Sequence, residues 1–341
     1  MPFADVIGHE QPKAILRAAL AHERLAHAYL FAGESAIGKR QLAWQFLHAV
    51  NCEGAPSESP DACGACRSCA QIAARTHPDV LVIEPDREMA HPQIKIEQIR
   101  ELEQALVYRP LIGRRKVCLI DDADALTIGA ANALLKTLEE PTAQSLFILV
   151  TGKPAALPAT IRSRCQLIRF VAPARTQVEA ALILRRNLPP DEARLLAMLT
   201  EGRLGLALGL DLQAVREQQQ EFAALAGPAT LRSVAKLLTA AESLAKAGRA
   251  QEALEWLTRW IRDLLLVRVG ADRDSILHLE RLAELTSLAR QVEAGALLDV
   301  LDLIQRLERQ ASRNLNPQMM LEQVLLRLRD ALGAELPAGR K

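Results

Sequence analysis

The architecture of this chain follows from residues 28–40, which read Ala28-Tyr-Leu-Phe31-Ala-Gly33-Glu-Ser-Ala-Ile-Gly38-Lys39-Arg40. A short apolar run, which predicts a strand, leads into the pattern G-x-x-x-x-G-K, and a helical segment follows over Gln41–Ala49. In this pattern the glycines let backbone N–H groups curl around phosphates, and the lysine meets the terminal phosphates. We therefore expect an α/β domain that contains a phosphate loop.

The phosphate loop departs from its pattern at the last position. Ser or Thr there would ligate Mg²⁺ through its hydroxyl, whereas Arg40 is a fixed cation with no acceptor. A second element, Val117-Cys-Leu-Ile-Asp121-Asp122, reads as an apolar strand that ends in the carboxylate expected to hold the metal. Its second acid, Asp122, stands where ATPases of this type usually carry Glu. We expect Gly33, Gly38, Lys39 and Asp121 to form a degenerate nucleotide site. This site is expected neither to bind nucleotide productively nor to hydrolyse it.

The first half of the chain alternates strand-like and helical segments, which predicts a parallel sheet. The expected strands are Ala28–Phe31, Asp79–Ile83, Lys116–Ile120, Ser145–Val150 and Leu167–Phe170, and the expected helices between them are Gln41–Ala49, Ile94–Leu106 and Gly129–Glu139. From about Pro173 onward only helical patterns remain. We predict a RecA-like domain over 1–171, a small helical lid over 172–211 with a loosely packed stretch at Gly202–Gly209, and a helical domain over 212–341. Loops are expected at Gly54–Pro60 and Pro337–Lys341.

Composition narrows the class of protein. The 341 residues carry 42 Lys and Arg against 41 Asp and Glu, which excludes a global basic field as the basis for nucleic-acid binding. Aromatic residues make up only 3%, and the abundance of Ala and Leu favours helix. The absence of a long apolar run or a secretory signal pattern predicts a cytoplasmic protein without membrane spans.

Four cysteines form a module within residues 52–69. Cys52, Cys63, Cys66 and Cys69 follow the spacing C-x10-C-x2-C-x2-C. In a reducing compartment such a cluster is better explained by tetrahedral Zn²⁺ than by disulfides, although unpaired thiols and an iron–sulfur cluster are alternatives. Four protein thiolates leave no open position for a catalytic water, so we expect the zinc to be structural. Cys118, within a predicted strand, is expected to be a core residue.

A further arginine lies in Thr160-Ile-Arg-Ser-Arg164-Cys165, directly before the last predicted strand. A guanidinium at the edge of a domain can reach the γ-phosphate of a nucleotide held by another subunit. From spacing alone, however, a solvated surface charge is the more common interpretation.

Together these motifs resemble one family. Leu25-Ala-His-Ala-Tyr-Leu-Phe-Ala-Gly33, the cysteine module, Asn132-Ala-Leu-Leu-Lys-Thr-Leu-Glu-Glu-Pro141 and Thr160–Cys165 are similar to bacterial clamp-loader subunits of the AAA+ class. Degraded nucleotide motifs beside an intact Ser-Arg-Cys resemble the delta-prime branch of that family. The resemblance is strong over about residues 1–170 and rests on helical character beyond them.

The resemblance implies a stator subunit that does not hydrolyse ATP itself, in a pentamer that opens a sliding clamp and places it on primed DNA. Arg164 matches the family's arginine finger, which completes the ATP site of an adjacent motor subunit, and the four cysteines match its zinc ligands. The implied partners are the gamma/tau motor subunits and the delta subunit, with the clamp and primer-template DNA met through the complex. Gly205 stands where motor subunits carry a sensor arginine, and Arg203 is out of register to replace it.

Two alternatives stay open. The chain could itself be an ATP-binding or ATP-hydrolysing motor subunit, against which Arg40 argues. It could also be a zinc-dependent nucleic-acid-binding module, but near the cysteines Arg67 and Arg75 are opposed by Glu53, Glu58 and Asp61.

Overall fold

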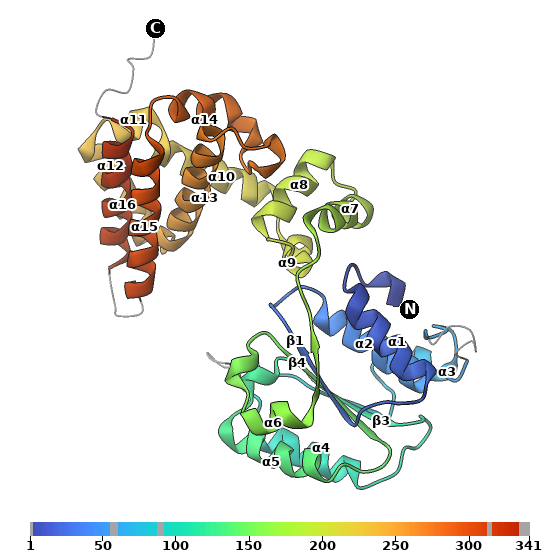
Figure 1. The fold of residues 1–341 in the computed structure, drawn as a ribbon. Coiled ribbons are helices and arrows are strands. Elements are labelled where there is room, and N and C mark those ends of the chain that lie inside the picture. Colours follow the sequence, from blue (N-terminus) through green and yellow to red (C-terminus); the bar gives the residue numbers. More distant parts are fainter. Residues whose placement is uncertain (1–2, 55–60, 87–91, 312–315, 334–341) are drawn as a thin grey trace. The chain divides into compact units, whose positions relative to one another are not determined.

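The computed structural model describes residues 3–54, 61–86, 92–311 and 316–333 (Figure 1). Of the loop predicted at 54–60, only Gly54 belongs to the described residues, so Glu58 lies outside them. The tail predicted at 337–341 also lies outside them. Contacts divide the chain into two compact units, Met1–Gly209 and Leu210–Lys341. The finer division into three domains remains a prediction.

The first unit is built on a five-stranded parallel sheet, as the α/β interpretation predicts. The strand order is β2-β3-β4-β1-β5. Every residue of β1, β3 and β4 is buried, which explains why these strands read as continuous apolar runs. The observed strand ends lie within one residue of the predicted ones: β1 (Ala28–Ala32), β2 (Val80–Ile83), β3 (Lys116–Ile120), β4 (Ser145–Thr151) and β5 (Gln166–Arg169).

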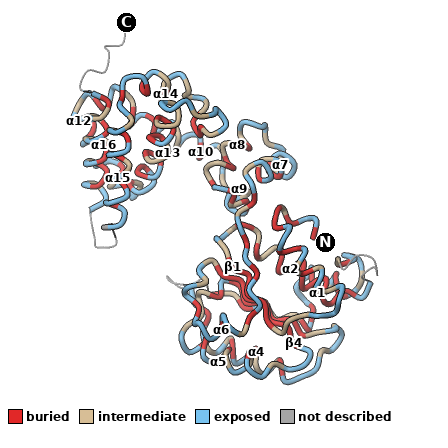
Figure 2. Tube along the Cα trace, viewed as in Figure 1, coloured by how far each residue is buried: buried red, intermediate tan, exposed pale blue. Residues whose placement is uncertain are grey.

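Helices cover both faces of the sheet (Figures 1 and 2). One face packs against α1 (Glu10–Ala21), α2 (Lys39–Asn51) and α3 (Arg67–Ala73), and the other against α4 (Ile96–Leu106), α5 (Ile128–Glu139) and α6 (Ala159–Arg164). Successive strand residues point to opposite faces, so Tyr29 and Phe31 belong to one core and Ala28 and Leu30 to the other. Cys118 is fully buried in β3, which confirms its prediction as a core residue.

Three further helices complete the first unit: α7 (Arg175–Arg186), α8 (Pro190–Leu199) and α9 (Leu204–Gly209). The prediction of a loosely packed stretch at 202–209 is wrong. Leu204 and Ala207 are buried, and the Gly205 N–H donates to the Ala36 carbonyl at 2.8 Å. A Cβ on Gly205 would lie 2.9 Å from that oxygen. Small residues here allow α9 to pack closely on the phosphate loop rather than leaving it loose.

In the second unit, every described element is helical. It contains α10 (Leu212–Ala226), α11 (Pro228–Leu231), α12 (Val234–Lys246), α13 (Ala250–Arg268), α14 (Leu282–Ala289), α15 (Ala294–Ala311) and α16 (Pro317–Ala331). The indole rings of Trp256 and Trp260 stack in its core, with their centres 5.2 Å apart. Short 3₁₀ helices occur at Phe3–Asp5, Ala123–Ala125, Pro154–Ala156, Arg273–Ser275 and Leu279–Arg281. None of the described helices combines the length and apolar character needed to cross a bilayer.

Candidate functional site

The phosphate loop joins the carboxyl end of β1 to the first turn of α2. Gly38 caps this helix with φ at +111°, a conformation that favours glycine. Lys39 does not extend into an open site, because its Nζ donates to the carbonyl oxygen of Gly33 at 2.8 Å and to that of Glu34. Burial lowers the pKa of Lys39, and the nearby carboxylates oppose this shift. The lysine therefore binds its own loop.

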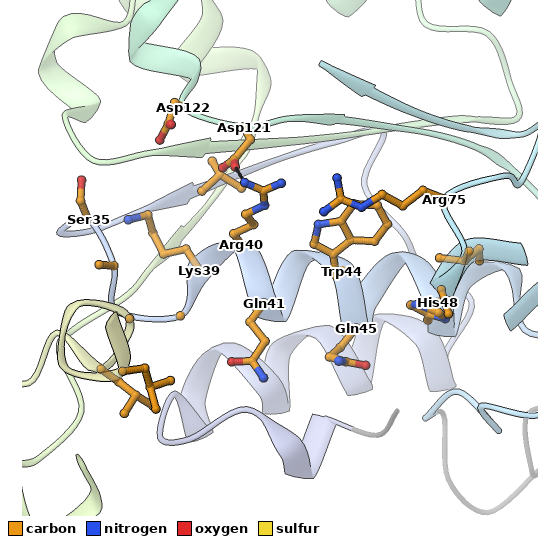
Figure 3. Close-up of a pocket in the computed structure, with 18 residues that line it drawn as sticks. Ser35, Lys39, Arg40, Gln41, Trp44, Gln45, His48, Arg75, Asp121 and Asp122 are labelled. Carbon is orange, nitrogen blue, oxygen red and sulfur yellow. Dashed lines mark ion pairs between the residues drawn. The ribbon is translucent and has the colours of Figure 1, made fainter. Parts of the chain in front are cut away.

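Arg40 is bound to two carboxylates. Its Nη1 lies 2.9 Å from Oδ2 of Asp121, and its Nη2 pairs with Glu84 (Figure 3 shows the Asp121 pair). Asp121 follows β3 and Glu84 follows β2, and these two strands are neighbours in the sheet. Burial raises the pKa of the Asp121 carboxyl, and the charge of Arg40 opposes this. The guanidinium thus neutralises the carboxylate that the sequence assigns to a metal.

The acids after β3 have separate positions. Asp122 has φ at +48°, is exposed, and lines the same pocket as Arg40. Asp124 accepts hydrogen bonds from Thr151 Oγ1 at 2.7 Å and from the Gly152 N–H at 3.0 Å. Burial pushes the pKa of Asp124 upward, but these donors outweigh it and leave the pKa lowered. In the sequence, Asp124 is marked only by its position three residues after Asp121, and no role was predicted for it.

A pocket of about 680 Å³ extends from the phosphate loop along α2 toward α3. Arg40, Trp44 and His48 line it at four-residue spacing on one face of α2. The Arg75 guanidinium lies 5.1 Å from the centre of the Trp44 ring, and burial lowers the pKa of His48 to about 4. Sequence reasoning missed this part of the pocket, although the four-residue spacing could have indicated it.

The residues around the expected sensor position do not supply a cation. Gly205 packs against Ala36 of the phosphate loop, and the pocket there is lined by Leu204 and Leu208. Arg203 donates from Nε to the Thr200 carbonyl at 3.0 Å, within its own turn.

The four predicted cysteines come together in space. Their sulfur atoms all lie within 4.8 Å of one another, so the cluster can bind a metal ion. The N–H groups of Cys63 and Cys66 donate to the sulfurs of Cys52 and Cys63 at 3.2 and 3.3 Å. Hydrogen bonds from the N–H groups of Ala65 and Cys66 lower the pKa of the Cys63 thiol to about 6, whereas burial raises the pKa of the Cys52 and Cys69 thiols. A pair between Arg17 and Asp61, at 3.3 Å, joins this segment to α1.

Arg164 lies away from this chain's own phosphate loop. It ends α6, its Nη2 lies 2.5 Å from Oε1 of Glu139, and its Nη1 donates to the Thr160 carbonyl at 2.9 Å. Arg164 comes just before β5, whose Gln166 lies beside Tyr29 at the start of β1. The phosphate loop follows the other end of β1, so the two features lie at opposite ends of these two adjacent parallel strands.

Comparisons of this chain with known proteins agree on one family. The family described as DNA polymerase III, delta subunit, matches residues 8–174, and the C-terminal family of the same subunit matches residues 216–330. The DNA polymerase III subunit delta' of Pseudomonas aeruginosa is 32% identical over 88% of this chain and 91% of its own length.

Subunit tau of Bacillus subtilis is 29% identical over 96% of this chain, which spans only 61% of that longer protein. A gamma subunit-related protein of Thermotoga maritima, whose structure is solved, is 20% identical with a TM-score of 0.44, over 95% of this chain and 99% of that one. With 32% identity to a delta' subunit across nine tenths of its length, and with both delta-subunit families matched, the chain belongs to the delta' family of DNA polymerase III subunits.

Proposed function

We propose that this chain is a non-motor stator subunit of the DNA polymerase III clamp loader. In this role it supports ATP-dependent loading of the sliding clamp on primed DNA and supplies Arg164 to the ATP site of an adjacent motor subunit. The observation that carries the proposal is the ion pair of Arg40 with Asp121, which puts a fixed cation against the carboxylate a metal would need.

Phosphoryl transfer depends on a metal ion that bridges the phosphate oxygens. A divalent cation beside the Arg40 guanidinium would meet charge repulsion, and Asp121 and Glu84 already accept from that guanidinium. Lys39, bound to the carbonyls of Gly33 and Glu34, would also have to release them before reaching a phosphate. Both features argue against turnover at this site.

The position of Arg164 favours action on a neighbour. Gln166 lies beside Tyr29, four residues before Gly33, which corresponds to about 13 Å along the strand at about 3.3 Å per residue. Arg164 is 34% exposed, and its partner Glu139 is half exposed. Exposed ion pairs contribute only ~0–1 kcal/mol, so a phosphate with bidentate geometry could displace Glu139 at little cost.

The cysteine cluster supports a structural zinc site. With Zn–S bonds of about 2.3 Å, four sulfurs in a tetrahedron lie about 3.8 Å apart, which falls within the 4.8 Å limit on the sulfur separations in this cluster. Cys52, Cys63, Cys66 and Cys69 would fill all four positions. Zinc there would fix the segment between α2 and α3 and would leave no position for a catalytic water.

The remaining partners follow from the family. We assign the gamma/tau motor subunits and delta as direct partners, and the clamp and primed DNA as partners met through the complex. The helical unit from Leu210 onward, with its separate core, is suited to form the collar that joins the subunits.

The non-motor assignment is tested by nucleotide binding to the isolated chain. With fluorescent ATP analogues and Mg²⁺ we expect no saturable, metal-dependent binding and no hydrolysis. Stoichiometric Mg²⁺-dependent binding followed by turnover would instead make the chain a motor subunit.

A further inference from the structure

Hydrogen bonds of buried polar groups connect the surface loop 111–115 to residues next to the cysteine cluster. The Asp79 carboxylate is fully buried and accepts three backbone N–H groups of this loop. Leu111 donates to Oδ1 at 2.7 Å, and Ile112 and Gly113 donate to Oδ2 at 2.8 and 2.7 Å. Burial favours the neutral acid, but these donors outweigh it and leave the pKa of Asp79 lowered. One carboxylate therefore fixes three consecutive residues.

Asp79 is itself oriented by His77. The backbone N–H of Asp79 donates to Nδ1 of His77 at 3.1 Å, so the ring proton of the neutral imidazole must be on Nε2. Nε2 lies 3.1 Å from Oγ of Ser68 and donates to it. Ser68 is fully buried in α3, one residue before the ligand Cys69. The hydrogen-bond chain therefore runs from the helix that contains Cys69 and is capped by Cys66 to the three amides of the loop.

A second connection starts at Asn51, the residue before Cys52. The Asn51 side chain donates from Nδ2 to the Arg115 carbonyl at 3.0 Å, and its Oδ1 accepts from the Arg115 N–H at 3.0 Å. A Cβ on Gly113 would lie 3.0 Å from atoms of the same amide, which explains the glycine there. Thus the neighbour of the first cysteine binds the loop directly, and the neighbour of the last cysteine is linked to it through His77 and Asp79.

These contacts fix a loop that nonetheless lies at the surface. Leu111 is 74% exposed and Arg114 is also exposed. The helix α3 has only seven residues, and an isolated helix of that length is unstable in water. Its position therefore depends on tertiary contacts: Ile72 packs in the core beside α2, and the cysteine cluster holds the start of the helix.

We propose that the cysteine module, once it binds zinc, sets the conformation of the surface loop 111–115 through Ser68, His77, Asp79 and Asn51. This inference rests on the zinc site proposed above and gives that site a role beyond stiffening its own segment. Without the metal, α3 loses the anchor at its start, Ser68 no longer orients His77, and Asp79 no longer holds the loop amides in one arrangement.

Hydrogen–deuterium exchange of the full chain tests the proposal, with zinc content measured in parallel. Removing zinc should raise exchange at the Leu111, Ile112 and Gly113 amides by about tenfold or more, since each loses a charge-assisted hydrogen bond. Amides of β4, such as those of Ile148 and Leu149, serve as internal controls and should not change. Increased exchange in α3 alone, with the loop still protected, would overturn the coupling.

Two variants keep the test independent of metal removal. Ser68→Ala and Asp79→Asn should retain one zinc per chain and still raise exchange in the loop, Asp79→Asn most, because an amide offers only one acceptor oxygen. Ser163→Ala, which removes an exposed hydroxyl bonded within its own helix, is the matched control and should leave the loop unchanged. Unchanged loop exchange in both variants would refute the proposal. A chain that never binds zinc would refute the proposed zinc site itself, a result that the zinc measurement distinguishes.

Discussion

Arg40 joins two carboxylates that come from different strands. Asp121 is buried and Arg40 is about one third exposed, so the pair is partly desolvated and each group depends on the other. The same guanidinium takes the position in sequence where a hydroxyl would ligate a metal. One side chain thereby supplies the charge balance that a divalent cation would supply in an active site.

Replacing Arg40 with Ser should expose this balance. In Arg40→Ser the Asp121 carboxylate loses its cation, and we expect a loss of about 1–2 kcal/mol in the free energy of unfolding without metal. Burial already raises the pKa of Asp121, so its ionised form is the costly one, and the loss should be larger at pH 8 than at pH 5. Denaturant titrations with and without Mg²⁺ measure this, and Mg²⁺ should restore part of the stability. Equal stability of both proteins at pH 8 would contradict the account.

Buried His48 makes the stability of the chain depend on pH. Burial lowers its pKa from 6.5 to about 4, so between these values the unfolded chain binds a proton that the folded chain does not. The contribution of the neutral His48 ring to the free energy of unfolding is complete above pH 6.5. It is lost as the pH falls toward 4, by up to about 3 kcal/mol. In His48→Gln the decline of stability from pH 7 to pH 4.5 should be shallower. Parallel curves for the two proteins, measured by chemical denaturation, would show that His48 does not titrate in this way.

At the scale of elements, the strands were predictable because a sheet buried on both faces leaves continuous apolar runs. The pairing of Arg40 with Glu84 was not, because it depends on β2 lying next to β3, and the two residues are 44 positions apart. The close packing of α9 was missed for a related reason. Glycine suggested looseness in the sequence, whereas Gly205 allows close approach to the Ala36 carbonyl. The cysteine cluster was predictable because its spacing places three of the four ligands within seven residues.

Metal removal tests the segment between α2 and α3. A strong zinc chelator should unfold α3 and lower the melting temperature of the unit that contains it, since binding energy at a structural site contributes to folding. Cys69→Ser should lose the metal and melt at a lower temperature in the same way. Cys165→Ala removes a buried thiol outside the cluster and should retain one zinc per chain. Full helicity and an unchanged melting temperature after verified zinc loss would argue against a structural metal.

For the whole molecule, the two units have separate cores. The second unit contains neither the cysteines nor the phosphate loop, so zinc removal should leave its unfolding transition in place. Calorimetry should therefore show one transition shifted by the chelator and one that is not. A single transition that shifts as a whole would show that the two units unfold together.

In the proposed function, Arg164 of this chain completes an ATP site in another subunit. This role is tested by DNA- and clamp-stimulated ATP hydrolysis by a reconstituted loader that contains either the unaltered chain or Arg164→Ala. Arg162→Ala, an exposed arginine on the same short helix, is the matched control, and sizing must show equal assembly. We predict that Arg164→Ala lowers turnover at the adjacent site by about 10³-fold or more, while Arg162→Ala does not. Unchanged hydrolysis with Arg164→Ala in a fully assembled loader would show that Arg164 completes no ATP site and is only a surface charge.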